Sequence, residues 1–285
     1  PAAYGDAKFV YYPMPWDIYD DMYVVRRPHV LIITKKANRA VADRSAPILE
    51  RAAVDNLSAW RRNGPPGTVT LPGFMIALEP ERRVYNKLFR VALKDNPNEA
   101  GFALAMRSFQ RAGEDGVGFG GARIAMDTRD SRWTGPDWRT GVLDIGRHEI
   151  AHAMVDPLLA DSAGVLNSPE TWLVEGFANY MAGRGRPDLQ REHVAALRGW
   201  TGFTGHLPNR FFFYAADSRD NSAHYALGTL AARYIADTWG EKALMRLVTE
   251  AYRKPGELDR QLTEITGLSM AEFERRWAAE VRKHL

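Results

Sequence analysis

The stretch Arg147-His148-Glu149-Ile150-Ala151-His152 holds an H-E-x-x-H pattern. Residues four apart on an α-helix lie about one turn apart on the same face. His148 and His152 can therefore bind one metal ion through neutral imidazole nitrogens, as zinc sites require. Glu149 projects toward the same side, offset from the metal, where it can hold a water molecule and take its proton. The pattern predicts a helix that carries two zinc ligands and a general base.

A second stretch, Trp172-Leu173-Val174-Glu175-Gly176-Phe177-Ala178-Asn179-Tyr180, offers the third ligand. A catalytic zinc needs three protein ligands and an open fourth position, and we expect Glu175 to complete the set. Asp156 is a rival, but it would point along the first helix rather than across the metal. Asn179 lies four residues after Glu175 on the same helical face, and we expect it to hydrogen-bond a ligating histidine, with His148 as the expected partner. The alternative is an asparagine exposed on its helix.

Composition and charge exclude several classes of protein. The 285 residues are 45% hydrophobic and 11% aromatic, so the chain can build a core. The net charge is only +3, with basic residues dispersed, which argues against a nucleic-acid binder. The chain has no cysteine, so any zinc must be held by histidine and carboxylate. No apolar run approaches the roughly 18 residues of a membrane span. The chain begins at Pro1 without a methionine, from which we expect a secreted or extracytoplasmic protein whose leader was removed.

The pattern of apolar residues predicts an α+β fold. The first part, 1–139, is mixed α/β with a small sheet, and the second, 140–285, is mostly helical and carries the zinc site; the two are compatible with one catalytic unit. Strands are expected at 9–12, 30–34, 74–78 and 122–127. Helices are expected at 38–62, 81–89, 140–156, 168–183, 187–198, 221–239, 241–253 and 269–284. The glycine-rich residues 116–121 lack the lysine of a phosphate loop, so we expect a flexible approach to a strand.

H-E-x-x-H followed by W-L-x-E-G-x-A-x-Y resembles the gluzincin metallopeptidases, the clan of thermolysin and aminopeptidase N. Residues 140–285 look closer still to the peptidase-MA-like domains of bacterial secreted proteins, whose Tyr-x-x-Gly helix corresponds here to 225–228 and whose terminal segment corresponds to 267–277. The resemblance implies a thermolysin-like catalytic architecture, one Zn²⁺ ion, and hydrolysis of peptide bonds in a peptide or protein substrate.

The resemblance also implies roles for residues outside the zinc motifs. Tyr225 would donate to the oxyanion of the tetrahedral intermediate, with His224 as the second candidate and a core tyrosine as the alternative. An edge strand before the zinc helix would pair with the extended substrate, and we expect residues 122–128 to form it. Ala125, Met126 and Asp127 would then contact the substrate, with Asp127 a candidate anchor for a free amine, although the glutamate-containing motif of the aminopeptidases is not matched.

Three functions remain open at the level of the sequence. The first is a zinc metallopeptidase that uses Glu149 as general base and acid. The second is a zinc hydrolase of another amide or ester, which the same residues would serve. The third is a catalytically silent binding module, against which Glu149 argues because such a module has no chemical need for that carboxylate.

Overall fold

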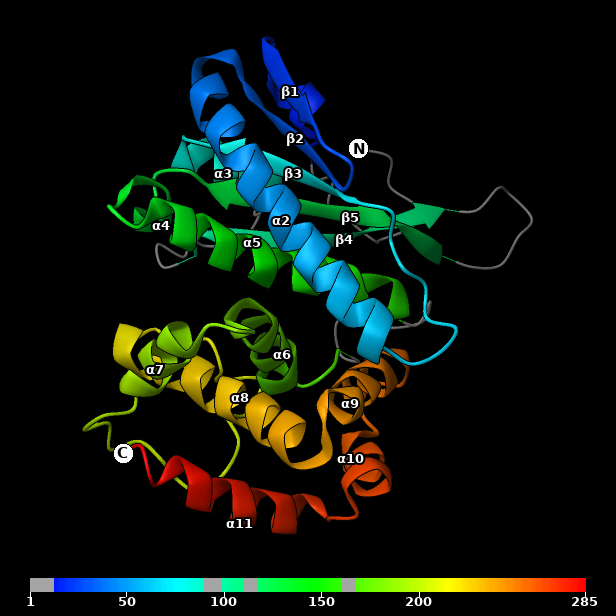
Figure 1. Cartoon of the computed structure of the whole chain (residues 1–285), viewed down its shortest axis with the longest axis vertical. Helices are drawn as coiled ribbons and strands as arrows, with labels where there is room; N and C mark the ends of the chain where they lie inside the picture. The colour runs from blue at the N-terminus through cyan, green and yellow to red at the C-terminus, as the bar shows by residue number, and fades with distance from the viewer. Residues whose placement is uncertain (1–12, 90–98, 110–116, 160–167) are drawn as a thin grey trace, which may run out of the picture. The chain divides into compact units, whose positions relative to one another are not determined.

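The computed structural model describes residues 13–89, 99–109, 117–159 and 168–285, and the strand expected at 9–12 lies outside them. The fold is α+β, with a five-stranded mixed sheet and a helical C-terminal part, as the sequence predicts (Figure 1). Contacts divide the chain into two compact units. The first comprises Pro1–Val54, Leu71–Met106 and Ala122–Ala153, and the second comprises Asp55–Thr70, Arg107–Gly121 and Met154–Leu285. Both histidines of the zinc motif therefore belong to the first unit.

The sheet has the strand order β1-β2-β3-β5-β4. β1 pairs antiparallel with β2, and β2, β3 and β5 are parallel to one another. Ile32, Ile76 and Ile124 stand side by side in register and are fully buried, which places a continuous apolar row across the middle of the sheet. The strands are β1 Met22–Arg26, β2 Val30–Lys35, β3 Phe74–Glu79, β4 Gly101–Phe109 and β5 Val117–Asp127.

The position of β4 corrects the expectation that residues 122–128 form the edge of the sheet. These residues lie at the end of β5, which is bordered by β3 on one side and β4 on the other. β4 was not predicted, because its residues are mostly alanine, leucine, methionine and glycine rather than the β-branched types that mark strands. The glycine-rich residues 117–121 belong to β5 itself and are not a flexible approach to it. Among the described strands, β1 and β4 lie at the two edges of the sheet.

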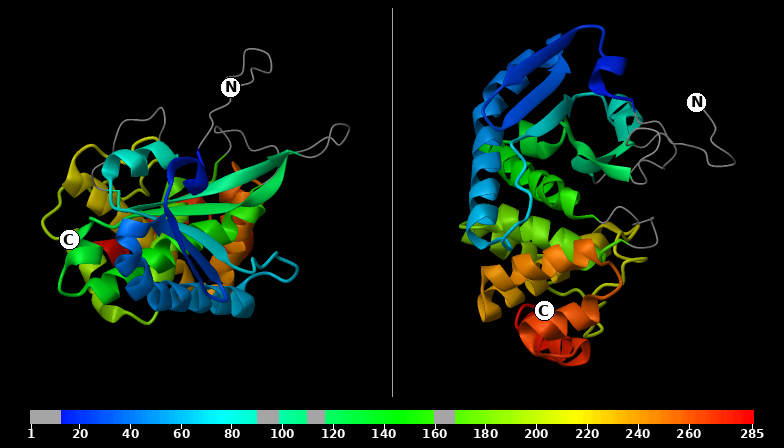
Figure 2. Two further views of the ribbon diagram at one scale, coloured as in Figure 1. Left: turned by 90° about the horizontal axis from the view of Figure 1, so that it is seen from above. Right: turned by 90° about the vertical axis from the view of Figure 1, so that its right-hand side faces the viewer.

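Helices lie on both faces of the sheet (Figure 2). On one face, Tyr85 and Leu88 of α3 (Arg82–Phe89) pack with Ala77 and Ala125 of the strands. The short helix α1 (Pro15–Ile18) contributes to this side through Ile18. The first half of α2 (Arg39–Asn63), which runs through Pro47 without ending there, covers the other face.

The zinc-motif helix, α5, spans Trp138–Val155 and follows the short helix α4 (Ser131–Thr134). It begins two residues before the expected start at Thr140. Gly146 on α5 faces α2, where an added Cβ would lie 2.9 Å from Leu49 Cδ2 and 3.2 Å from Ala52 Cβ. The two helices are therefore in close contact at this glycine, which fixes how deeply α5 sits on α2.

The second unit is built around α8 (Ser218–Trp239), which contacts α6, α7, α9 and α11 (Figure 1). Asp217 caps α8 by accepting from the backbone amides of Arg219 and Asp220, so the helix starts before the expected residue 221. Ser269 caps α11 through the amide of Glu272, as expected from the sequence.

No helix in the described part of the chain is long and apolar enough to cross a bilayer. The other helices are α6 Thr171–Gly183, α7 Pro187–Ala195, α9 Glu241–Arg253, α10 Leu258–Thr266 and α11 Met270–Val281, with the one-turn helix η2 Asp156–Leu158 before them.

Two glycines allow α6 and α8 to touch along their backbones. A Cβ on Gly176 would overlap the carbonyl oxygen of Gly228, and a Cβ on Gly228 would lie 2.8 Å from the carbonyl oxygen of Trp172. Gly176 directly follows Glu175, so this backbone contact sets the position of the expected third ligand relative to α8.

We predict that Gly176→Ala lowers the free energy of unfolding of the helical unit by about 1–3 kcal/mol, because the methyl group meets rigid backbone and the helices must separate. Gly183→Ala is the matched control, since its Cβ would make only an ordinary 3.5 Å contact with Gln190 Cγ at the end of the same helix. Urea unfolding followed by circular dichroism compares the two. Equal stability of the two variants would contradict the close contact.

Candidate metal centre

The half-buried imidazoles of His148 and His152 bring their Nε2 atoms close together on one face of α5. The two atoms lie 3.1 Å apart, and the rings stand edge to face with their centroids 4.8 Å apart. Two nitrogens that each bind a tetrahedral zinc ion at 2.0–2.1 Å are themselves separated by about 3.3 Å. The helix therefore presents this histidine pair with a spacing that suits a shared metal ion, as the sequence predicts.

Glu149 is buried next to the first residue of β4. Its exposed fraction is 4%, and an added Cβ on Gly101 would lie 2.5 Å from Glu149 Oε1. With glycine at position 101, the strand passes close to this carboxylate without displacing the Glu149 side chain. The expected general base is thus held at the free edge of the sheet, one residue along α5 from His148.

Glu175, on α6, is also buried, with 6% exposed. The hydroxyl of Tyr214 donates to Glu175 Oε1 at 2.5 Å. Burial of the hydroxyl, followed by the negative charge of Glu175, raises the pKa of Tyr214 well above its ordinary value, so Tyr214 remains a neutral donor.

Asn179 is tied to α8 rather than exposed on its helix. Its amide donates to Thr229 Oγ1 at 3.1 Å, and the Thr229 hydroxyl donates to the carbonyl oxygen of Tyr225 at 2.7 Å. Only 8% of Asn179 is exposed. This chain of hydrogen bonds links the face of α6 that carries Glu175 to the turn of α8 that carries Tyr225. The expected bond between Asn179 and His148 stays a prediction.

Tyr225 and His224 lie in the first turns of α8 against the segment that precedes it. The ring of Tyr225 packs edge to face on Phe213, with centroids 5.1 Å apart, and 6.3 Å from the ring of Tyr214. The His224 Nδ1 atom lies 2.8 Å from the carbonyl oxygen of Phe213. Both side chains are half-buried, and His224 is occupied in holding this backbone in place.

The residues expected to contact a substrate from β5 are placed differently. Ala125 and Met126 are fully buried, and Ala125 belongs to the core cluster under α3. Asp127 is 6% exposed and pairs with Arg82 at 3.2 Å and Arg129 at 3.7 Å. These placements correct the expectation for Ala125 and Met126, because β4 covers the edge of β5 along which a substrate would have paired. The ion pairs of Asp127 make it a poor anchor for a substrate amine.

Tyr214 is the residue of this region whose role the sequence did not predict. Of residues 211–214, only Phe213 is buried, whereas Phe211, Phe212 and Tyr214 are exposed. Tyr214 and Glu175 are 39 residues apart in the chain. The segment before α8 is irregular, so no periodicity points from one residue to the other.

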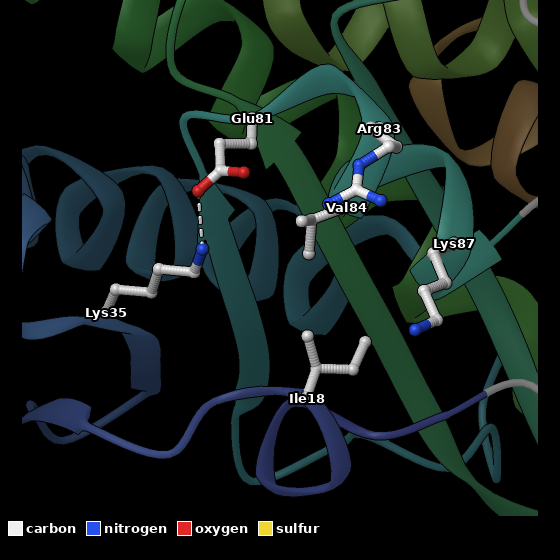
Figure 3. A pocket seen from close by; sticks show the side chains of 6 residues that line it. All are labelled: Ile18, Lys35, Glu81, Arg83, Val84 and Lys87. Atoms are coloured by element: carbon white, nitrogen blue, oxygen red, sulfur yellow. Dashed lines mark hydrogen bonds and ion pairs between the residues drawn. The ribbon is translucent and has the colours of Figure 1, made fainter.

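A pocket of about 250 Å³ lies at the carboxyl ends of the parallel strands β2 and β3 (Figure 3). Lys35 and Glu81 pair across it at 2.5 Å, an interaction that raises the pKa of Lys35 and lowers that of Glu81. None of the residues expected at the active site lines this pocket. Its lining residues are Ile18, Lys35, Glu81, Arg83, Val84 and Lys87.

Within the described part of the chain, the group of histidine and carboxylate side chains that could hold a metal ion is His148, His152 and Glu175. Two imidazoles and one carboxylate form the donor set of a catalytic zinc site that keeps one position open. Because the chain has no cysteine, the thiolate sites that dominate structural zinc centres are excluded. The residues present therefore fit a catalytic zinc ion.

No protein-family model and no curated protein matches the sequence. Among solved structures, a variant of a two-domain M1 zinc metallopeptidase bound to L-tryptophan is similar, with 15% identity and a TM-score of 0.48; the match covers 90% of this chain and 51% of that one. An M1 zinc metallopeptidase from Deinococcus radiodurans is similar with 17% identity and a TM-score of 0.45, covering 90% of this chain and 50% of that one. The chain thus spans about half the length of these structures. At these scores, its function has to be argued from its own residues.

Proposed function

We propose that the chain is a zinc-dependent metallopeptidase of the gluzincin type, in which His148, His152 and Glu175 hold one zinc ion. The observation that carries the proposal is the pair of Nε2 atoms 3.1 Å apart on α5. Glu175 supplies the carboxylate that completes a His₂Glu donor set. The extracytoplasmic location expected from the sequence stays a prediction.

A zinc ion held by these residues would supply Lewis acidity, the chemistry that activates water at neutral pH and polarises a carbonyl. Glu149 takes the proton of the attacking water and delivers it to the leaving amine, which makes it base first and acid afterwards. Its burial beside Gly101 suits this task, because a carboxylate with little contact to bulk water exchanges its proton with the groups next to it.

Tyr225 supplies the neutral donor for the negative charge that develops on the carbonyl oxygen. Such a donor acts only as charge appears, so it lowers the barrier without tightening ground-state binding. The packing of its ring on Phe213 and the bond from Thr229 to its backbone give it a fixed position on α8.

An extended peptide would pair with β4, which is the free edge of the sheet closest to the zinc helix in sequence. β4 begins at Gly101, against Glu149, so a strand added there would run past the general base. Peptides methylated on their backbone nitrogens cannot form such a ladder. Their resistance to cleavage, compared with unmethylated peptides of the same sequence, tests this arrangement.

One prediction of the proposed mechanism concerns Glu149→Gln, which removes the base and keeps the shape of the side chain. We expect the variant to keep one zinc per chain and to lose hydrolysis by about 100- to 10,000-fold. Metal analysis and cleavage of a peptide library with free and blocked N-termini measure both quantities. Glu192→Gln, at an exposed carboxylate on α7, is the control and should behave as the unaltered protein.

Three results would separate the competing functions in that experiment. Zinc binding with hydrolysis of esters or other amides, but of no peptide, would replace the peptidase by a different hydrolase. Stoichiometric zinc with no hydrolysis of any substrate, and no effect of Glu149→Gln, would indicate a silent binding module. Full peptidase activity in Glu149→Gln would contradict the proposed mechanism.

A further prediction of the mechanism concerns Tyr225→Phe. Loss of one oxyanion donor should lower kcat by about 100- to 1,000-fold, while KM and zinc content stay unchanged. Tyr234→Phe, on the same helix, is the control, because the ring of Tyr234 packs on Trp239 and Phe273. A rise in KM at unchanged kcat would assign Tyr225 to substrate binding instead.

A further inference from the structure

Tyr214 joins an irregular segment of the chain to the carboxylate of Glu175. Its hydroxyl donates to Glu175 Oε1 at 2.5 Å, whereas 57% of the residue's surface is exposed. Its neighbour Phe213, by contrast, is fully buried. Tyr214 is thus bonded to α6 through its hydroxyl, whereas Phe213 anchors the segment through its buried ring.

We propose that Tyr214 is a positioning residue of the metal centre: its hydroxyl binds one oxygen of Glu175 and so orients the carboxylate to give its other oxygen to zinc. The inference rests on the proposed function, because it assumes that Glu175 is a zinc ligand. It assigns Tyr214 no contact with the substrate.

The hydrogen bond acts on Glu175 in two ways. A carboxylate that is 94% buried loses most of its hydration, and a neutral donor compensates part of that loss without adding charge. Metal ligands must also be deprotonated, so a donor that stabilises the anion favours metal binding. In addition, one bond to one oxygen restricts rotation of the carboxylate, which is the usual effect of groups that support a ligand.

Tyr214 is itself held by the part of α8 that carries Tyr225. The carbonyl oxygen of Phe213 lies 2.8 Å from the Nδ1 atom of His224, and the Phe213 ring packs on both Tyr214 and Tyr225, at 5.4 and 5.1 Å between centroids. Phe213 and Tyr214 therefore link Glu175, the proposed third ligand on α6, to Tyr225, the proposed oxyanion donor on α8. A substitution at Tyr214 should therefore affect the position of the Glu175 carboxylate first, because the Tyr214 hydroxyl is bonded to it.

The test compares Tyr214→Phe with a matched variant, Tyr180→Phe. Tyr180 also donates its hydroxyl to a carboxylate, Glu241, at 2.7 Å, and it lies on α6, the helix that carries Glu175. We expect Tyr214→Phe to weaken zinc binding by about 10- to 100-fold in competition with a chromophoric chelator. Tyr180→Phe should leave zinc affinity unchanged, although it removes a hydrogen bond of the same kind.

Two further readouts separate positioning from a general loosening of the fold. The metal-free forms of Tyr214→Phe and Tyr180→Phe should unfold at similarly lowered temperatures, because each variant loses one hydrogen bond from a tyrosine to a carboxylate. In addition, kcat of Tyr214→Phe should recover when zinc is saturating. Unchanged zinc affinity in Tyr214→Phe, or an equal loss in both variants, would overturn the inference. Absence of zinc binding by the unaltered protein would instead overturn the proposed function on which the inference rests.

Discussion

The approach of two imidazole nitrogens to 3.1 Å on α5 is the constraint on which the account of this protein depends. Two neutral histidines can share at most one hydrogen between these atoms, whereas a metal ion accepts a lone pair from each. The helix supplies the spacing, because residues four apart stand one above the other. Gly146 fixes the depth of this helix on α2, and Gly101 allows β4 to reach Glu149. These two glycines thus allow close packing around the helix that carries the histidine pair and around Glu149.

In the helical unit, close contacts at glycine also position Glu175 and Tyr225. Gly176 and Gly228 bring α6 and α8 into backbone contact, one residue from Glu175 and three residues from Tyr225. Thr229 then joins Asn179 to the backbone of Tyr225. Most of these groups stand on helices, which hold side chains more firmly than loops do. Tyr214 is the exception, and its segment is anchored by the buried ring of Phe213.

The local features of the chain could be predicted from its sequence, and the long-range ones could not. The α+β fold and the pairing of His148 with His152 follow from periodicities of two and about 3.6 residues. The capping serine of α11 follows from a short pattern of the same kind. β4 was missed because alanine, leucine and methionine carry no strand signal there, and that omission wrongly made residues 122–128 an edge. Asp127 was a candidate substrate anchor through the resemblance to the aminopeptidases, and its ion pair with Arg82, 45 residues away in the chain, could not be predicted. The link from Tyr214 to Glu175 was missed for the same reason.

The most direct test of the central claim is to locate the metal in crystals of the zinc-loaded protein by anomalous diffraction at the zinc absorption edge. We expect a single strong peak within about 2.0–2.2 Å of His148 Nε2, His152 Nε2 and one carboxylate oxygen of Glu175. Tyr214 should remain bonded to the other oxygen. A peak that lacks Glu175 among its ligands, or a zinc ion bound elsewhere on the chain, would contradict the account.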